Sequence, residues 1–300
     1  MKVYLNDPMA ASAIKRLKAH VEIVDNYDHP EELDAIIVRQ QFCTADVIRK
    51  AVRCKLIQQH GVGLDRIDIK TADECGIPVK NTPGINARSV AEYTVSMMLD
   101  LSRKVTEIDR KTRKGMLPRF GMPETVGYEF THKRLGLIGS GNIANEVAQI
   151  CRDGFHMDIC CHSSHRSAEE IRKMGYTPVS IPEMFSFCDY VSIHCLLTPE
   201  TYHLIGSKCF QDCNPNLILV NTARGGLVDE KALYEALVSG KISAAGLDVF
   251  ENEPPLTDNP LLSLDNFLAG MHVAGSTYEA LERNGNAVVD SVFEALGIDG

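Results

Sequence analysis

A glycine turn between an apolar strand and an amphipathic helix constrains the fold of this chain most strongly. In "LGLIGSGNIANEVAQ", Gly139, Gly141 and Ala144 form a Gly-x-Gly-x-x-Ala pattern. The first glycine allows a tight bend, the second lets backbone approach a pyrophosphate, and the small third residue lets helix and strand pack closely. Free N–H groups at the helix start, at Asn142 and Ile143, favour phosphate. The pattern predicts a dinucleotide-binding βαβ unit, and a purely structural turn is the alternative.

Short apolar runs separated by helix-like stretches divide the chain into two segments. The first contains "KVYLN", "VEIV", "AIIVR", "KLIQQHG" and "PVKNT", and the second contains "LGLIG", "DICCH", "YVSIHC", "LILVN", "AAGLDVF" and "NFLAGMHV". Such alternation is typical of parallel, doubly wound sheets. The 300 residues are enough for about two domains. We therefore expect two α/β domains.

Two further amphipathic stretches lie outside these runs. Residues 86–114 place apolar side chains at helical spacing, among them Val90, Thr94 and Met98, and predict one long helix that joins the two segments. The final stretch, residues 277–297, has the same periodicity and no strand after it. If this helix packs on the first sheet, that domain is discontinuous in sequence.

Composition excludes several classes of protein. A formal net charge of −9 argues against a nucleic-acid-binding surface. No apolar run approaches the roughly 20 residues of a membrane span, and "MKVYLNDPMA" leads into a strand without a signal-peptide core. The ten cysteines match no zinc spacing and are interpreted as small apolar residues of a reduced protein. We expect a cytoplasmic protein without a metal site and without nucleic-acid or membrane partners.

Three polar signatures follow successive strands of the second segment. Arg224 comes after "LILVN", where a ligand-facing guanidinium suits a carboxylate. Asp248, Glu251 and Glu253 lie in or just past "AAGLDVF", and His272 lies among small and apolar residues. Each alone is more often a surface ion pair, a solvated loop or a core histidine. Together, beyond a nucleotide-binding turn, they indicate a base, an acid that orients it and an arginine for an anionic substrate.

The motifs that carry these residues resemble the D-isomer-specific 2-hydroxyacid dehydrogenases, which include phosphoglycerate dehydrogenase, glyoxylate/hydroxypyruvate reductase and D-lactate dehydrogenase. The matching blocks, in the family's order, are "GVGLDRIDIKTADECGIPVKNTPGINARSVAEYT", "LGLIGSGNIA", "LLTPETYHLI", "LVNTARGGLVDEKAL", "GLDVFENEPP" and "HVAGST". They extend over nearly the whole chain. A series of this length makes the resemblance specific.

The resemblance implies an α/β fold with two doubly wound parallel-sheet domains, in which a Rossmann cofactor domain is inserted in a flavodoxin-like substrate domain. We place the substrate (catalytic) domain at residues 1–97 plus 271–300 and the NAD(P)-binding domain at 98–270. It also implies a homodimer, with the 86–114 helix as the candidate contact.

The resemblance further implies the roles of the site residues. Arg224 would hold the carboxylate and carbonyl of the substrate, His272 would act as acid/base, and Glu253 would pair with the histidine. Val62 and Gly63 would offer backbone N–H groups to the carboxylate. Reduction of a 2-oxo acid needs a hydride at the carbonyl carbon and a proton on its oxygen, which an imidazolium can supply.

Other positions would bind the cofactor or the distal part of the substrate. Asp248 would meet the nicotinamide amide. Arg39 lies where some relatives bind a phosphate or distal carboxylate, although the second arginine found nearby in relatives is Gln41 here. The complete cofactor-binding set is Gly139, Gly141, Asn142, Ile143, Ser163, Ser164, Arg166, Thr198, Thr222, Asp248 and Gly275.

The residues after the second strand of the glycine-turn unit bear on the choice of cofactor. NAD-binding units commonly carry an acid there, which binds the adenosine ribose. Here "DICCH" is followed by Ser163, Ser164, His165 and Arg166. Serine removes the repulsion of a 2′-phosphate, and the arginine can pair with it. We predict a preference for NADP, and use of NAD as well is the alternative.

We therefore expect an NAD(P)-dependent oxidoreductase that interconverts a small 2-oxo acid and a D-2-hydroxy acid. One alternative is a short-type phosphoglycerate dehydrogenase. A rival of another class is an NAD(H)-sensing interaction protein, similar to a corepressor of the family. Retention of Arg224, Glu253 and His272 favours the enzyme.

Overall fold

The chain forms two compact units in the computed structural model, which describes residues 1–116, 122 and 125–299. Unit 1 combines residues 1–86 with the segment from Ser276 onward, and unit 2 spans Ala87–Gly275. The domain boundaries expected at 97/98 and 270/271 both fall inside unit 2. The first differs because the helix that contains residue 97 packs along its length in the core of unit 2. The second differs because the segment after residue 270 is hydrogen-bonded to Asp248.

Unit 1 contains a five-stranded parallel sheet. Its strands are β1 (Lys2–Tyr4), β2 (Glu22–Val24), β3 (Ala35–Val38), β4 (Ile57–Gln59) and β5 (Val79–Lys80). Their order is β2-β1-β3-β4-β5, and all pairs are parallel. The predicted flavodoxin-like sheet is therefore confirmed, since its strand order is the 2-1-3-4-5 arrangement.

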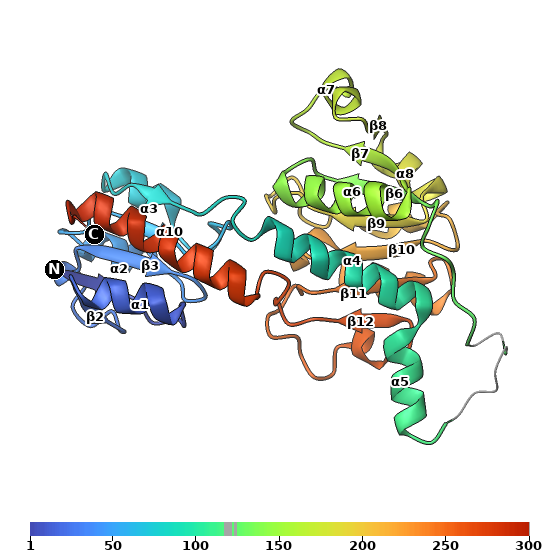
Figure 1. Cartoon of the computed structure of the whole chain (residues 1–300), viewed down its shortest axis with the longest axis horizontal. Helices are drawn as coiled ribbons and strands as arrows, with labels where there is room; N and C mark the ends of the chain where they lie inside the picture. Colours follow the sequence, from blue (N-terminus) through green and yellow to red (C-terminus); the bar gives the residue numbers. More distant parts are fainter. Residues whose placement is uncertain (117–121, 123–124, 300) are drawn as a thin grey trace. The chain divides into compact units, whose positions relative to one another are not determined.

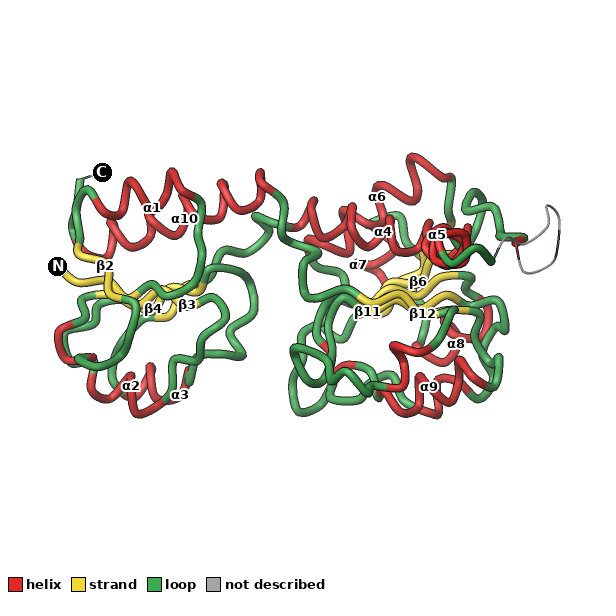
Figure 2. Tube along the Cα trace, turned by 90° about the horizontal axis from the view of Figure 1, so that it is seen from below, coloured by secondary structure: helices red, strands yellow, loops and turns green. Residues whose placement is uncertain are grey.

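Helices cover both faces of this sheet (Figure 2). Helices α1 (Ala11–Lys18) and α10 (Tyr278–Leu296) lie on one face, and α2 (Ala45–Lys50) and α3 (Ile69–Glu74) lie on the other. Apolar residues of α10, including Val288 and Val292, join the buried cluster that contains Leu17 of α1. The last helix thus completes the N-terminal sheet, because its apolar face would otherwise be exposed to water.

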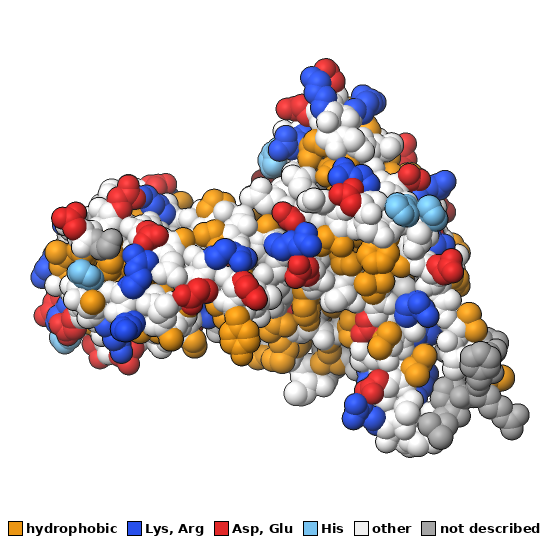
Figure 3. All heavy atoms as spheres, viewed as in Figure 1, with side chains coloured by type: hydrophobic (Ala, Val, Ile, Leu, Met, Phe, Trp, Pro, Cys, Tyr) orange, Lys and Arg blue, Asp and Glu red, His pale blue; other side chains and the backbone are white. Residues whose placement is uncertain are grey.

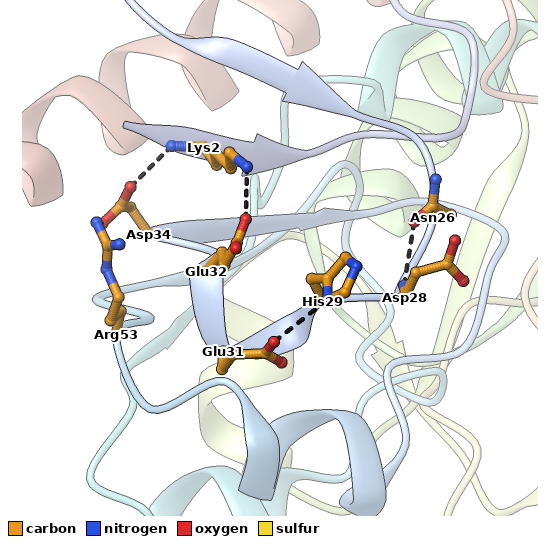
Figure 4. Close-up of polar contacts among 8 residues, drawn as sticks. All are labelled: Lys2, Asn26, Asp28, His29, Glu31, Glu32, Asp34 and Arg53. Atoms are coloured by element: carbon orange, nitrogen blue, oxygen red, sulfur yellow. Dashed lines mark hydrogen bonds and ion pairs between the residues drawn. The ribbon is translucent and has the colours of Figure 1, made fainter.

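A polar network joins the first strand to the segment before β3 (Figure 4). The backbone N–H of Lys2 donates to Asp34 Oδ2 at 2.7 Å, and Arg53 Nη2 donates to Oδ1 of the same carboxylate at 2.9 Å. Lys2 Nζ donates to Glu32 at 2.5 Å. Asp34 is buried, and these hydrogen bonds satisfy the oxygens of its carboxylate beside the core.

Unit 2 contains a seven-stranded parallel sheet. Its strands are β6 (Arg134–Ile138), β7 (Asp158–His162), β8 (Thr177–Pro178), β9 (Tyr190–Ile193), β10 (Ile218–Asn221), β11 (Ala244–Leu247) and β12 (Phe267–Ala269). The order β12-β11-β10-β9-β6-β7-β8 is the Rossmann arrangement with one added edge strand. The predicted Rossmann sheet is confirmed. The sequence did not reveal β8, because two residues that include a proline carry no strand pattern.

Two helical layers enclose the sheet of unit 2 (Figures 1 and 2). Helices α4 (Ala87–Arg103) and α6 (Asn142–Phe155) pack on one face, and α8 (Ile181–Phe187) and α9 (Glu230–Val238) pack on the other. The helix α7 (Ala168–Lys173) follows β7. The strand order reverses between β6 and β9, which is where ligands of open α/β sheets bind.

The long helix expected over residues 86–114 is two helices, and that prediction is wrong. Helix α4 ends at Arg103 and α5 (Val105–Arg113) begins after Lys104, which has φ 54°. The carbonyl of Ser102 accepts from Tyr128 N at 2.9 Å, so it does not continue the helical ladder. The N–H of Thr106 instead donates to Asp100 Oδ1 at 2.8 Å. The returning chain therefore interrupts the helix.

Acidic and basic side chains are interspersed on the face of each unit seen in Figure 3. Many form ion pairs, for example Arg88 with Glu92 and Glu146 in unit 2 and Arg16 with Asp290 in unit 1. None of the helices in the described part of the chain combines the length and apolarity that a membrane crossing requires.

Candidate active site

The glycine turn connects β6 to α6 and leaves the start of this helix open. Gly139 has φ 110°, and a Cβ there would lie 2.4 Å from the carbonyl oxygen of His194. A Cβ on Gly141, the residue that precedes α6, would meet no atom within 4 Å. No side chain caps α6, so its first N–H groups, those of Asn142 and Ile143, are available to an anion. The turn therefore fits a dinucleotide pyrophosphate.

Three side chains form a small polar cluster where β7 ends beside the glycine turn. Ser140 Oγ donates to Ser163 Oγ at 3.0 Å, and Arg166 Nε donates to Ser140 Oγ at 3.1 Å. The N–H of His165 is 3.3 Å from Ser163 Oγ. Ser164 and Arg166 are exposed. The cluster holds one cation and two hydroxyls, and it has the chemistry to bind a phosphate.

His272 and Glu253 form a direct pair. Nδ1 of His272 lies 2.9 Å from Glu253 Oε2, and the side chains are 44% and 25% exposed. A carboxylate beside Nδ1 favours the tautomer or the cation that donates from that atom, so a ligand would meet the ring at Nε2. Phe250 N lies 3.4 Å from Glu253 Oε1. The pair has the arrangement of an acid/base with its orienting carboxylate.

Asp248 holds the backbone at the histidine and at the two residues that follow it. Its carboxylate accepts from Val273 N at 3.1 Å and from Ala274 N at 2.8 Å, and its carbonyl accepts from His272 N at 2.6 Å. Burial raises the pKa of Asp248, and the hydrogen bonds from Ala274 and Val273 oppose that rise. His272 has φ 54°, a left-handed conformation that histidine adopts more readily than most residues.

Arg224 lies on the loop after β10. This loop is held in place by close backbone contact with the loop that contains Phe250. Asn221 Nδ2 donates to Arg224 O at 2.8 Å, and Asn221 Oδ1 accepts from Ala223 N at 2.9 Å. A Cβ on Gly225 would lie 1.9 Å from the carbonyl carbon of Phe250. Only glycine therefore allows the arginine loop to contact the loop that leads to Glu253. Arg224 Nη1 donates to Ala223 O at 2.7 Å.

The two acids considered after β11 have different surroundings. Glu253 pairs with His272, whereas Glu251 Oε1 accepts from Glu230 N at 3.2 Å and lies 3.1 Å from His203 Nε2. The geometry therefore separates the acid beside the candidate base from an acid that connects loops. Sequence spacing alone could not separate them.

Three other predicted cofactor residues follow strands of unit 2 along the chain. Thr198 N donates to Thr201 Oγ1 at 2.7 Å in the loop after β9. Thr222 is buried, and its hydroxyl lies 2.9 Å from that of Thr94 in α4. Gly275 is the last residue of unit 2.

The remaining predicted residues belong to unit 1. Val62 and Gly63 follow β4, and Asn81 Nδ2 donates to Val62 O at 2.8 Å. Arg39 follows β3, and its Nη1 donates to Pro8 O at 2.5 Å. No motif in the sequence singled out Gln59 and His60, which are buried polar residues at the end of β4 and directly after it. The sequence feature that could have indicated them is the run of three uncharged polar residues at 58–60, which directly follows the apolar residues of the strand.

A model of the D-isomer specific 2-hydroxyacid dehydrogenase family, for its NAD binding domain, matches residues 95–274. This chain belongs to that family. The hydroxypyruvate reductase of Thermotoga maritima is 38% identical over 99% of both chains. The D-3-phosphoglycerate dehydrogenase of Methanocaldococcus jannaschii is 39% identical over 99% of this chain, which spans 57% of that longer protein.

Solved structures agree with the family membership. The D-lactate dehydrogenase of Aquifex aeolicus, complexed with NAD and lactic acid, superposes with a TM-score of 0.88 at 27% identity, covering 99% of this chain and 96% of that one. An acyclic imino acid reductase (Bsp5) with NADPH and D-Arg has a TM-score of 0.88 at 27% identity, over 99% and 97% of the two chains. The chain is therefore a 2-hydroxyacid dehydrogenase, an oxidoreductase that acts on CH–OH donors with a nicotinamide cofactor.

Some residues that shape this dehydrogenase's site carried no motif signal. Ser140 was only a variable position between two glycines, yet it bridges Ser163 and Arg166. Tyr93 of α4 lies at the Asp248 carboxylate, since a Cβ on Gly270 would be 2.8 Å from its hydroxyl and 2.2 Å from Asp248 Oδ1. These contacts join residues far apart in the chain, so no local pattern reports them.

Proposed function

We propose that this enzyme works mainly as a 2-oxoacid reductase in which His272 supplies the proton. The observation that carries the proposal is the 2.9 Å contact between His272 Nδ1 and Glu253 Oε2. A carboxylate on Nδ1 orients the ring and stabilises the imidazolium, which leaves Nε2–H to donate to the carbonyl oxygen of a substrate. When bound, the nicotinamide cofactor supplies the hydride.

Arg224 is proposed to bind the carboxylate of the substrate. Its loop lies beside the loop of Glu253, and the planar guanidinium can donate two parallel hydrogen bonds to a carboxylate. In unit 1, Val62 and Gly63 are proposed to offer N–H groups to a carboxylate, and Arg39 to lie near its distal substituent. Asp248 is proposed to support the nicotinamide side of the site while it holds the backbone after His272.

The cluster of Ser140, Ser163 and Arg166 supports a preference for NADP. A carboxylate at position 163 would repel a 2′-phosphate, whereas serine and arginine can donate to it. The arginine is already oriented toward Ser140 at 3.1 Å, so a phosphate in this position would need little rearrangement. Use of NAD remains the alternative.

We propose a small substrate without a phosphate group, and phosphoglycerate dehydrogenase activity as the second candidate. Arg39 donates to Pro8 O, and position 41 is Gln41 rather than an arginine, so fewer cations face a phosphate here. The second candidate is supported by the M. jannaschii relative, whose matched region covers nearly all of this chain.

Two further properties are part of the proposal. A homodimer is supported by α5, in which none of the described residues is buried and Val105 is 59% exposed. A cytoplasmic location is supported by the ten cysteines, all of which are free thiols.

The experiment is a turnover assay with a panel of substrates. Purified protein is tested with NADPH and with NADH on glyoxylate, hydroxypyruvate, pyruvate, 2-ketoisocaproate, phenylpyruvate and 3-phosphohydroxypyruvate. The proposal expects the highest kcat/KM on a non-phosphorylated 2-oxo acid with NADPH. The highest value on 3-phosphohydroxypyruvate would support the second candidate. No turnover on any substrate, together with tight cofactor binding, would favour a nucleotide-sensing protein.

A further inference from the structure

We propose that His203, together with Glu251 and Glu230, is a positioning residue for the acid/base pair. Its side chain would hold the loop that carries Glu253 against the loop that carries Arg224. The inference rests on the proposed role of Glu253 as the partner of His272. It adds a residue that would act through Glu253.

The backbone and the ring of His203 connect to two different loops. Its N–H donates to Gly226 O at 2.8 Å, two residues after Arg224 in the chain. Its Nε2 lies 3.1 Å from Glu251 Oε1, two residues before Glu253. The ring also stacks on Tyr202, with centroids 4.0 Å apart. One residue therefore joins the arginine loop to the glutamate loop.

Glu251 and Glu230 reinforce this connection. The N–H of Glu251 donates to Glu230 Oε1 at 2.7 Å, and the N–H of Glu230 lies 3.2 Å from Glu251 Oε1. Asn259 Nδ2 donates to Glu230 Oε2 at 2.7 Å. Glu230 opens α9, whose N-terminal dipole favours both carboxylates. The reciprocal bonds fix the start of the 251–253 segment to a helix.

The loop that carries Arg224 and the loop that carries Glu253 are in close backbone contact, so a change at the His203–Glu251 pair would alter the distance between them. Gly225 lies against the Phe250 carbonyl and the Glu251 N–H, with no room for a Cβ. A shift of the 251 segment would therefore move Glu253 and also disturb the residue next to Arg224. Losing the side-chain bond between His203 and Glu251 removes one of the contacts that keep the segment from shifting.

The partial exposure of His203 and Glu251 indicates that their contact serves to position the loop more than to stabilise the fold. The side chains of His203 and Glu251 are 32% and 27% exposed, so truncating either leaves no closed cavity in the core. The free energy of unfolding should change little, because partly exposed pairs contribute little to it. The geometry of Glu253 should change more, because the bond lies two residues from it.

The test uses two substitutions at His203 that differ in reach. His203 has φ 51°, a conformation that asparagine also tolerates, so His203→Asn keeps the backbone but is too short to reach Glu251. His203→Gln can place an amide N–H near the position of Nε2. His132→Asn is the matched control, since His132 is an exposed histidine of the same unit with φ 58°. Each variant is also made in a Glu253→Gln background.

The expected result is a drop of about tenfold in kcat for His203→Asn, the size of one charge-assisted hydrogen bond. The Kd for the reduced cofactor and the melting temperature should stay near wild type. His203→Gln should recover most of the kcat, and His132→Asn should have no effect. In the Glu253→Gln background, His203→Asn should cost less than about twofold, because its effect passes through Glu253.

Two results would overturn the inference. One is a His203→Asn variant with wild-type kcat, and the other is an equal loss in both backgrounds. The Glu253→Gln variant by itself tests the proposed function, since a wild-type kcat there would remove Glu253 from the acid/base pair. The two failures are therefore distinguishable.

Discussion

The carboxyl edges of the two sheets satisfy their polar groups in different ways. In unit 2, the Asp248 carboxylate accepts two backbone N–H groups and Glu253 contacts His272. In unit 1, β4 runs into Gln59 and His60, both buried. Gln59 Oε1 and His60 Nε2 have no hydrogen-bond partner within the described residues. The same type of sheet thus ends in a connected network in one unit and, in the other, in buried groups that the described protein atoms do not hydrogen-bond.

The difference lies in which buried polar groups the protein itself hydrogen-bonds. A buried polar atom left without any partner costs about 1–3 kcal/mol, so Gln59 and His60 need a partner from outside the described protein atoms, such as water or a ligand. In unit 2 the corresponding groups orient one another before any ligand binds. Preorganised groups of this kind need no rearrangement at the moment of reaction. Four predictions test this contrast, in order of decreasing expected effect.

Removing the imidazole should have the largest effect, because it takes the proton donor from the connected network of unit 2. We expect His272→Gln to lower kcat by about 10²–10⁴-fold, the usual range for general acid–base catalysis. Cofactor affinity should barely change. Steady-state kinetics under chemistry-limited conditions measure the effect, and a variant that keeps more than half of the wild-type kcat would exclude His272 from the role.

Replacing the arginine by lysine tests whether geometry or charge matters at Arg224. An ammonium keeps the charge but cannot reproduce a bidentate fork, so we expect kcat/KM to fall by about 100-fold for Arg224→Lys. The loss should be similar for every 2-oxo acid in the panel. If one substrate alone is affected, Arg224 determines specificity and is not the general carboxylate ligand.

The stability of unit 1 should depend on pH through His60. Burial, and after it the neighbouring Arg39, lower the pKa of His60 to about 4. The unfolded chain therefore binds the proton more tightly, and stability is present above the ordinary pKa of 6.5 and lost as pH falls. The loss at pH 5 should be about 2 kcal/mol.

Hydrogen exchange at the amides of β3 and β4 measures this loss in unit 1 separately from unit 2. His60→Leu should flatten the dependence in unit 1 between pH 4 and 6.5. Unit 2 should keep its own dependence, because burial lowers the pKa of His194 to about 3. An unchanged profile in unit 1 would exclude His60 as the cause.

The smallest effect is expected at the ribose end of the cofactor site. Arg166→Ala should raise the KM for NADPH about tenfold, the size of one charged contact with the 2′-phosphate, and leave the KM for NADH nearly unchanged. Ser163→Asp should reverse the preference. Competing titrations in which the wild-type protein binds NADH tenfold more tightly than NADPH would contradict the proposal.

Local sequence patterns were sufficient to predict most strands and helices, but they predicted poorly where these elements end. The glycine turn, eleven apolar runs and the last amphipathic helix were readable from the sequence, because periodicity and turn chemistry act over a few residues. The interruption at Lys104 was not readable, since it depends on Tyr128 reaching the Ser102 carbonyl. The two-residue strand β8 was missed because it is defined by its neighbour β7.

The sequence by itself determined the chemical groups of the site and their order along the chain: the glycine turn, Arg224, the acids after β11 and His272. The tertiary structure decided which of these groups meet. The resemblance already implied that Glu253 pairs with His272, and the structure places their atoms 2.9 Å apart. The structure alone revealed that Glu251 contacts His203 and that both carboxylate oxygens of Asp248 accept from backbone N–H groups. It also revealed that Ser140 joins Ser163 and Arg166. The physical reason is that hydrogen bonds act over about 3 Å in space. The partners come from different strand ends of one parallel sheet, and only folding brings them together.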